Sequence, residues 1–217
     1  MLTILLTRHG HTDRSEPEQY LGQRITATLT ERGRRDARAL ADRLSDVPIQ
    51  RIVSSPLARA LETAHILSDA RVQSVEADGR LAELDYGAWE GLTLDQIEQR
   101  FPGEYELYDR DPSAHRVGGG ESGASVARRI QPLIHELVDW GTQAEAEQIC
   151  VLVGHSSVNR VLLALVLGVP LVDYRRRFEQ DWANLTVLRW PDGRSGPTLL
   201  LANDVAHVRG VKGVTWG

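Results

Sequence analysis

Short apolar runs alternate along the chain with segments in which apolar residues recur at helical spacing. A short continuous apolar run that ends at turn residues is typical of a buried strand. Such runs predict strands at residues 2–7, 51–53, 72–75, 149–153, 185–190 and 199–202.

Three segments between these runs carry helix signals. Thr30 is a suitable N-cap for a helix over residues 31–45. A second helix is predicted over residues 56–68, because a proline suits its first turn, and a third over 157–167, which stops at Gly168. Strands that alternate with helices indicate an α/β fold. We expect a three-layer sandwich with a largely parallel central sheet flanked by helices.

Residues 101–123 break this alternation. They are rich in proline and glycine and carry two tyrosines, Tyr105 and Tyr108. Long loops of this kind in a compact domain are often functional. We therefore expect a single domain over residues 1–217 with a lid or insertion at about 101–123.

The composition argues against nucleic-acid and membrane partners. The formal net charge is −5 and no basic run stands out. The longest apolar stretch, residues 161–167, is too short to span a bilayer. Residues 1–7 do not form a signal peptide, because Arg8 and His9 interrupt them. We expect a cytoplasmic protein.

Two residue counts restrict the chemistry. Cys150 is the only cysteine, so neither an internal disulfide nor a thiol cluster for zinc is available. Lys212 is the only lysine, so an anion site must consist of arginine, histidine and backbone N–H groups. Arginine binds phosphate as a planar fork.

Candidate chemistry lies where the predicted strands end. Arg8 and His9 follow the first strand, residues 54–59 follow the second, and His155 follows the run at 149–153. Ligands of α/β sheets bind at the carboxyl ends of the strands. We therefore expect these residues to meet in one site.

The segment at residues 8–13, Arg-His-Gly-His-Thr-Asp, allows two chemistries. In the first, the neutral imidazole of His9 attacks phosphorus and carries the phosphoryl group covalently, with Arg8 as an anion clamp. In the second, residues 9–13 are a His-x-His-x-Asp metal-binding run. Arg8 and Arg14 flank that run and would repel a divalent cation, which favours the phosphoryl interpretation.

Two further segments predict anion contacts. Arg59 lies early in a helix, beside serines and free backbone N–H groups, which together make an anion site. His155 and Ser156 open another helix and can both donate to a phosphate. Taken alone, each segment is equally consistent with a capped helix and a solvated or structural polar residue.

Glu83 is the candidate general acid, because a carboxylic acid can protonate a leaving oxygen. It lies in the segment 81–91, which also contains Asp85 and Glu90. Those two residues are rival candidates that the sequence does not exclude. A solvated position is the simpler interpretation for both.

Read in order, these segments resemble the histidine phosphatase superfamily, the phosphoglycerate mutase-like proteins. The resemblance covers nearly the whole chain. It rests on residues 8–10 (Arg-His-Gly), 29–33 (Leu-Thr-Glu-Arg-Gly), 54–60 (Ser-Ser-Pro-Leu-Ala-Arg-Ala), 119–122 (Gly-Gly-Glu-Ser), 154–156 (Gly-His-Ser) and 203–207 (Asn-Asp-Val-Ala-His).

The resemblance implies a role for each matching position. His9 would be the phosphorylated nucleophile and Glu83 the proton donor, later the base that activates water. Arg8, Arg59 and His155 would bind the phosphoryl group, whose spread negative charge preorganised cationic donors stabilise. No metal or other cofactor is implied.

Some positions depart from the family pattern or carry weaker expectations. Ser15 stands where relatives often have an asparagine that contacts phosphate, and Ser156 stands where glycine is common. Both are expected to contact phosphate. Gln23 and His11 are expected to contact substrate.

The segment 84–91 resembles phosphatases, because it lacks the basic residues that mutases carry there. We therefore expect an acid phosphatase-type phosphomonoesterase acting on a small phosphorylated metabolite. The alternatives are a cofactor-dependent phosphoglycerate mutase and a non-catalytic module that binds a phosphorylated ligand.

Two arginines of the predicted lid bear on substrate choice. Arg110 and Arg116 are expected to bind a second anionic group of the substrate. The C-terminal strand is compatible with pairing across a homodimer.

Overall fold

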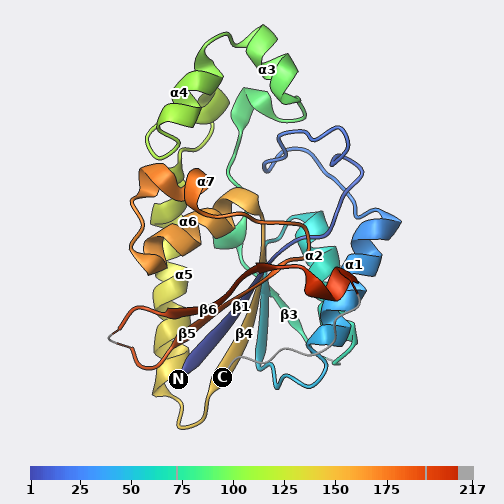
Figure 1. Ribbon diagram of the computed structural model, residues 1–217, viewed down its shortest axis with the longest axis vertical. Helices are drawn as coiled ribbons and strands as arrows, with labels where there is room; N and C mark the ends of the chain where they lie inside the picture. Colours follow the sequence, from blue (N-terminus) through green and yellow to red (C-terminus); the bar gives the residue numbers. More distant parts are fainter. Residues whose placement is uncertain (72, 194, 210–217) are drawn as a thin grey trace.

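The computed structural model describes residues 1–71, 73–193 and 195–209. Within them the chain forms one six-stranded sheet with the order β3-β2-β4-β1-β5-β6 (Figure 1). The strands are β1 (Leu2–Arg8), β2 (Arg51–Ser54), β3 (Val75–Ala77), β4 (Gln148–Gly154), β5 (Leu185–Trp190) and β6 (Thr198–Asp204). Strands β3, β2, β4 and β1 are parallel, whereas β5 runs antiparallel to both β1 and β6. The sheet is therefore mixed, with a parallel centre.

Helices cover both faces of the sheet, as expected for a three-layer sandwich. Helices α1 (Glu31–Arg43) and α2 (Ala58–Asp69) pack on one face, where Leu5 of β1 contributes to their core. Helices α5 (Gly123–Gln143) and α6 (Ser156–Leu167) pack on the other, where Ile4 and Leu6 contribute. The alternation of side chains along β1 thus builds both cores, because successive residues of a strand face opposite sides of the sheet.

Helix α1, which follows β1 in the chain, begins at the residue predicted from the sequence. The Thr30 hydroxyl accepts a hydrogen bond from the backbone N–H of Gly33, which caps α1. Helix α6 ends at Gly168, whose φ of 67° lies in the left-handed region that glycine adopts easily. Helix α2 begins at Ala58, two residues later than the helix predicted from position 56.

The strand predicted at residues 72–75 is displaced toward the C-terminus. The structure has β3 at Val75–Ala77, and Val72 lies outside the described residues. Ile52 pairs with Val75 and Ser54 pairs with Ala77. This edge strand is mostly exposed. An apolar pattern in the sequence indicates buried strands, so it does not locate β3, whose position follows from pairing with β2.

The segment expected to be a lid contains helix α4 (Glu104–Arg110) and a short 3₁₀ turn at Val117–Gly119, and helix α3 (Leu94–Arg100) precedes it. Figure 1 shows α3 and α4 beyond the carboxyl ends of the central strands, above α7 (Tyr174–Arg177). The described part of this segment has no strand, as expected. None of the helices in the described ranges is long and apolar enough to cross a bilayer.

Candidate active site

A cavity of about 500 Å³ opens at the carboxyl ends of β1 and β4. Its walls come from segments far apart in the sequence. The lining includes Arg8, His9, Arg14, Ser15, Tyr20, Glu83, Tyr108, Ser156, Arg160, Arg175 and Trp182. Four arginines line it, which suits an anionic ligand, together with the carboxylates of Glu18, Glu83, Glu179 and Asp181. Arg59 and His155 are not part of this lining.

His9 presents one free ring nitrogen in this site. The residue follows β1 and is 5% exposed. Its Nδ1 lies 2.8 Å from the carbonyl oxygen of Gly10, and since a carbonyl only accepts, Nδ1 carries the hydrogen. Nε2 therefore holds a lone pair. Burial, and then the charges of Arg59 and Arg8, hold the pKa of His9 well below its usual value, so the ring is neutral at neutral pH.

Two guanidinium groups flank His9. The Arg59 side chain is 1% exposed, and its Nη2 donates to the carbonyl oxygens of Leu21 and Gly22 at 3.2 and 2.9 Å. Arg8 donates through Nη1 to the Gln180 carbonyl at 2.8 Å. The Nε atoms of both arginines are buried without a hydrogen-bond partner among the described residues. Each arginine therefore retains donor capacity for an anion.

His155 stands next to His9, with ring centroids 5.0 Å apart. It is fully buried, and its Nε2 lies 2.7 Å from the hydroxyl oxygen of Ser55. Its Nδ1 has no partner within the described part of the chain. Burial, followed by the charge of Arg59, lowers the pKa of His155 well below its usual value. A neutral ring with one unused nitrogen thus lies beside the candidate nucleophile.

The Glu83 carboxylate is anchored on the first turn of α6. One oxygen accepts from the backbone N–H of Ser157 at 3.0 Å. The other accepts from the N–H groups of Val158 and Leu84 at 3.1 and 2.8 Å. The side chain is buried but reaches the same cavity as His9. A carboxyl group and an imidazole with a free lone pair therefore meet in one site.

A sequence profile of the histidine phosphatase superfamily (branch 1) matches residues 4–205 of this chain. The chain belongs to the histidine phosphatase superfamily. A glucosyl-3-phosphoglycerate phosphatase of Mycolicibacterium vanbaalenii is 38% identical over 172 residues, which cover 77% of this chain and 75% of the relative. A probable phosphoglycerate mutase of Enterobacter sp. is 27% identical over 210 residues, covering 96% and 95%.

Solved structures of the superfamily share this fold. The structure of mycobacterial glucosyl-3-phosphoglycerate phosphatase with VO3 has a TM-score of 0.84 and 33% identity to this chain. The match covers 93% of this chain and 98% of that one. The α/β prediction is thereby confirmed.

Some of the other residues predicted to bind phosphate or substrate line the cavity of this histidine phosphatase, and others do not. Ser15 and Ser156 both line the cavity. The Ser15 hydroxyl accepts from the N–H of Thr12 at 3.0 Å, so protein contacts already hold it in place. Gln23 does not line the cavity, because its amide nitrogen donates to the Glu83 carbonyl oxygen at 2.8 Å.

His11 uses both ring nitrogens on protein partners. Its Nδ1 lies 3.0 Å from the Thr30 hydroxyl, its Nε2 lies 3.2 Å from a Glu16 carboxylate oxygen, and its edge packs on Trp182. It is not part of the cavity lining. Across residues 1–71, 73–193 and 195–209, no group of three or more histidine, cysteine, aspartate or glutamate side chains is placed to hold a metal ion.

The cavity arginines differ from those proposed from the sequence. Arg110 is exposed at the end of α4, and Arg116 donates through Nε to the Gly120 carbonyl oxygen at 3.0 Å. Neither lines the cavity, whereas Arg160 and Arg175 do. Arg160 follows the His155 motif on α6, and that helical spacing could have indicated it. Arg175 reaches the cavity only because α7 packs against α6, which no local pattern reveals.

Proposed function

We propose that this chain is a metal-independent phosphomonoesterase that hydrolyses a small phosphorylated metabolite through a phosphohistidine at His9. The observation that carries the proposal is the free Nε2 of a neutral His9, whose pKa is lowered by the buried Arg59 and the partly buried Arg8. A neutral imidazole can attack phosphorus, and the guanidinium groups balance the negative charge that spreads over the phosphoryl oxygens.

The first step transfers the phosphoryl group to the protein. The lone pair of His9 Nε2 forms a bond to phosphorus while the bond from phosphorus to the ester oxygen breaks. The ester oxygen keeps the electron pair of that bond and takes a proton from Glu83, so an alcohol leaves. Arg8, Arg59 and His155 hold the phosphoryl oxygens.

The second step returns the group to water. The Glu83 carboxylate takes a proton from a water molecule, whose oxygen bonds to phosphorus. The bond from phosphorus to Nε2 breaks, and its electron pair returns to the ring. Inorganic phosphate leaves, and both Glu83 and His9 are restored to their starting states.

The lowered pKa of His9 supports the acid phosphatase-type assignment. A histidine nucleophile works only in its neutral form. Because the pKa of His9 lies well below its usual value, that form persists into mildly acidic solution. Activity is then expected to extend to acidic pH.

The outer part of the cavity supports a substrate with a second anionic group. Arg160 and Arg175 line the cavity in addition to Arg8. Arg160 pairs at 3.3 Å with Glu179, an exposed carboxylate that an anionic ligand can displace, and its Nε is buried without a described partner. Arg175 pairs at 3.3 Å with the half-exposed Asp109. The curated phosphatase relative bears the name of a substrate with a carboxylate besides its phosphate.

A phosphoglycerate mutase is the second candidate, supported by the similarity to the Enterobacter relative. A mutase starts with the same phosphohistidine but returns the phosphoryl group to the substrate. The two functions differ in whether phosphate appears in solution. The cytoplasmic location, the homodimer and the single domain over residues 1–217 stay predictions.

The test is an assay of phosphomonoesters in EDTA with the native chain and His9→Ala. The panel contains p-nitrophenyl phosphate, phosphoserine and 3-phosphoglycerate, the last also with 2,3-bisphosphoglycerate present. We expect phosphate release that survives EDTA and disappears in His9→Ala. Interconversion of phosphoglycerates without phosphate release would instead identify the mutase. No turnover in the native chain would leave a binding module.

A further inference from the structure

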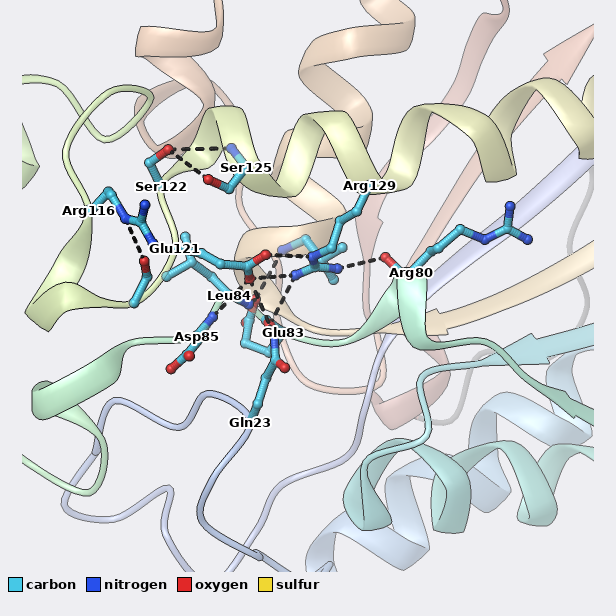
Figure 2. Close-up of polar contacts among 12 residues, drawn as sticks. Gln23, Arg80, Glu83, Leu84, Asp85, Arg116, Glu121, Ser122, Ser125 and Arg129 are labelled. Atoms are coloured by element: carbon cyan, nitrogen blue, oxygen red, sulfur yellow. Dashed lines mark hydrogen bonds and ion pairs between the residues drawn. The ribbon is translucent and has the colours of Figure 1, made fainter.

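The backbone carbonyl of Glu83 is held by two side chains. Gln23 donates to it through Nε2 at 2.8 Å, and Arg129 of α5 donates through Nη2 at 3.1 Å (Figure 2). Arg129 also donates through Nη1 to the carbonyl oxygen of Arg80 at 2.7 Å. One guanidinium therefore fixes the chain at Glu83 and three residues before it.

Glu121 completes this arrangement from the end of the predicted lid. Its carboxylate accepts from Arg129 through Nε at 2.9 Å and Nη2 at 3.0 Å, which is the two-pronged geometry of strong arginine–carboxylate pairs. The same carboxylate accepts from the backbone N–H of Asp85 at 3.1 Å and from Gln23 at 3.3 Å. Residues on both sides of Glu83 are thus tied to one ion pair.

Glycines bring Glu121 to this position. A side-chain carbon on Gly120 would lie 2.1 Å from the carbonyl oxygen of Asp85, and one on Gly118 would lie 2.6 Å from the backbone nitrogen of Ala88. The two loops therefore touch through their backbones, which only glycine permits. The N–H of Glu121 also donates to the Asp85 carbonyl at 2.8 Å. The loop that carries Glu121 is docked directly on the loop that carries Glu83.

We propose that Glu121 and Arg129 are positioning residues that hold Glu83 for proton transfer. Neither lines the cavity, and their hydrogen bonds end on the backbone at Glu83 and Asp85. The N–H groups of α6 fix the carboxylate end of Glu83, and the ion pair fixes its backbone end. A side chain anchored at both ends presents its carboxyl group in one geometry, and displacements of about 1 Å in an active site can cost about 100-fold in rate. The proposal rests on the assigned role of Glu83 as the general acid.

The dependence of kcat/KM on the leaving group distinguishes a loss of proton donation from general damage to the active site. p-Nitrophenolate leaves phosphorus readily without a proton, whereas the alkoxide of phosphoserine needs one. Since kcat/KM reports the step in which the leaving group departs, loss of the acid lowers kcat/KM for phosphoserine far more than for p-nitrophenyl phosphate. General acid catalysis contributes about 100- to 10,000-fold. Glu83→Gln defines the full size of the difference in this chain.

The variants are Glu121→Gln, which keeps shape but removes the charge, and Arg129→Met. The matched control is Arg128→Met, because Arg128 is the exposed neighbour of Arg129 on α5. We expect both test variants to lose about 10- to 100-fold in kcat/KM for phosphoserine and less than about a third of that factor for p-nitrophenyl phosphate. The control should match the native chain. Thermal unfolding of each variant identifies the temperature below which all are folded, where the assays are run.

The double variant Glu83→Gln/Arg129→Met tests whether Arg129 acts through Glu83. Once the acid is absent, removing Arg129 should add no further leaving-group dependence. Equal losses for both substrates in Glu121→Gln and Arg129→Met, or additive dependence in the double variant, would overturn the positioning role. Should Glu83→Gln itself show no leaving-group dependence while the native chain is active, the acid assignment fails instead. An inactive native chain rejects the proposed function.

Discussion

The Nε2 of His155 and the hydroxyl oxygen of Ser55 lie 2.7 Å apart, and this contact favours one tautomer of the ring. The Ser55 oxygen already accepts from the backbone N–H of Leu57 at 3.3 Å. The hydroxyl hydrogen of Ser55 has Nε2 as an acceptor, and this donation places the hydrogen of His155 on Nδ1, which has no partner among the described residues. His155 is thereby prepared as a donor to a phosphoryl oxygen.

Ser55→Ala should weaken phosphate binding. Without the hydroxyl, the ring loses a contact that favours the tautomer with hydrogen on Nδ1. A hydrogen bond of this kind contributes about 1 kcal/mol, so we expect about a fivefold rise in the inhibition constant of inorganic phosphate. Ser54→Ala is the control, because within the described ranges the Ser54 hydroxyl donates only to the carbonyl of Ser55. Equal weakening in both variants would refute the tautomer argument.

The pH dependence of His9 follows from its lowered pKa. Because the charged ring is disfavoured, His9 should remain neutral as the pH falls through 6.5, where an exposed histidine gains its proton. NMR titration of the imidazole in the free protein measures this directly. Since Arg59 contributes to the lowering, Arg59→Met should move the titration of His9 to higher pH. An unchanged titration in that variant would show that the charge of Arg59 does not lower the pKa of His9.

Arg175→Gln should select against acidic substrates. Loss of a charged contact to a second anionic group raises KM for phosphoserine or 3-phosphoglycerate by about tenfold or more, with a change of at most about twofold for p-nitrophenyl phosphate. Arg110→Gln and Arg116→Gln serve as matched controls, since both residues lie outside the cavity lining. A selective effect in the controls, rather than in Arg175→Gln, would restore the assignment made from the sequence.

Arg43→Met should destabilise the fold without touching the cavity. The buried Arg43 of α1 donates to Asp204 at 2.6 Å and to Nδ1 of His207 at 3.1 Å, which ties the helix to the end of β6. Removing one partner of a largely buried charged pair costs about 3 kcal/mol. We expect a fall in Tm of roughly 6–12 °C. Arg38→Met, in an exposed pair with Glu31, should change stability by less than about 0.5 kcal/mol.

The central fold could be predicted because its strands are buried on both faces. The runs that became β1 and β4 are mostly apolar and almost wholly buried, and Arg8 and Gly154 end them. The exposed β3 lacks that signal, and its position depends on pairing with β2. Helices α3 and α4 span one or two turns each, too short for a clear period in the sequence.

The site also contains residues that the sequence could locate and residues that it could not. Arg8, His9 and His155 follow strands directly, so their meeting could be expected from the architecture. The contact of Gln23 with substrate stays a prediction, and the hydrogen bond of its amide to the Glu83 carbonyl is not apparent from the sequence. The contacts of Glu121 and Arg175 join segments that are distant in the sequence. Such contacts depend on tertiary packing, which a local pattern does not contain.

The position of β1 in the middle of the sheet orders events during synthesis. This strand is made before the other strands of the sheet, and its neighbours β4 and β5 begin at Gln148 and Leu185. Contacts between distant segments form late, because the chain between them must first be closed into a loop. Because β4 and β5 flank the strand that presents His9, a chain that ends before Leu185 is expected to be inactive.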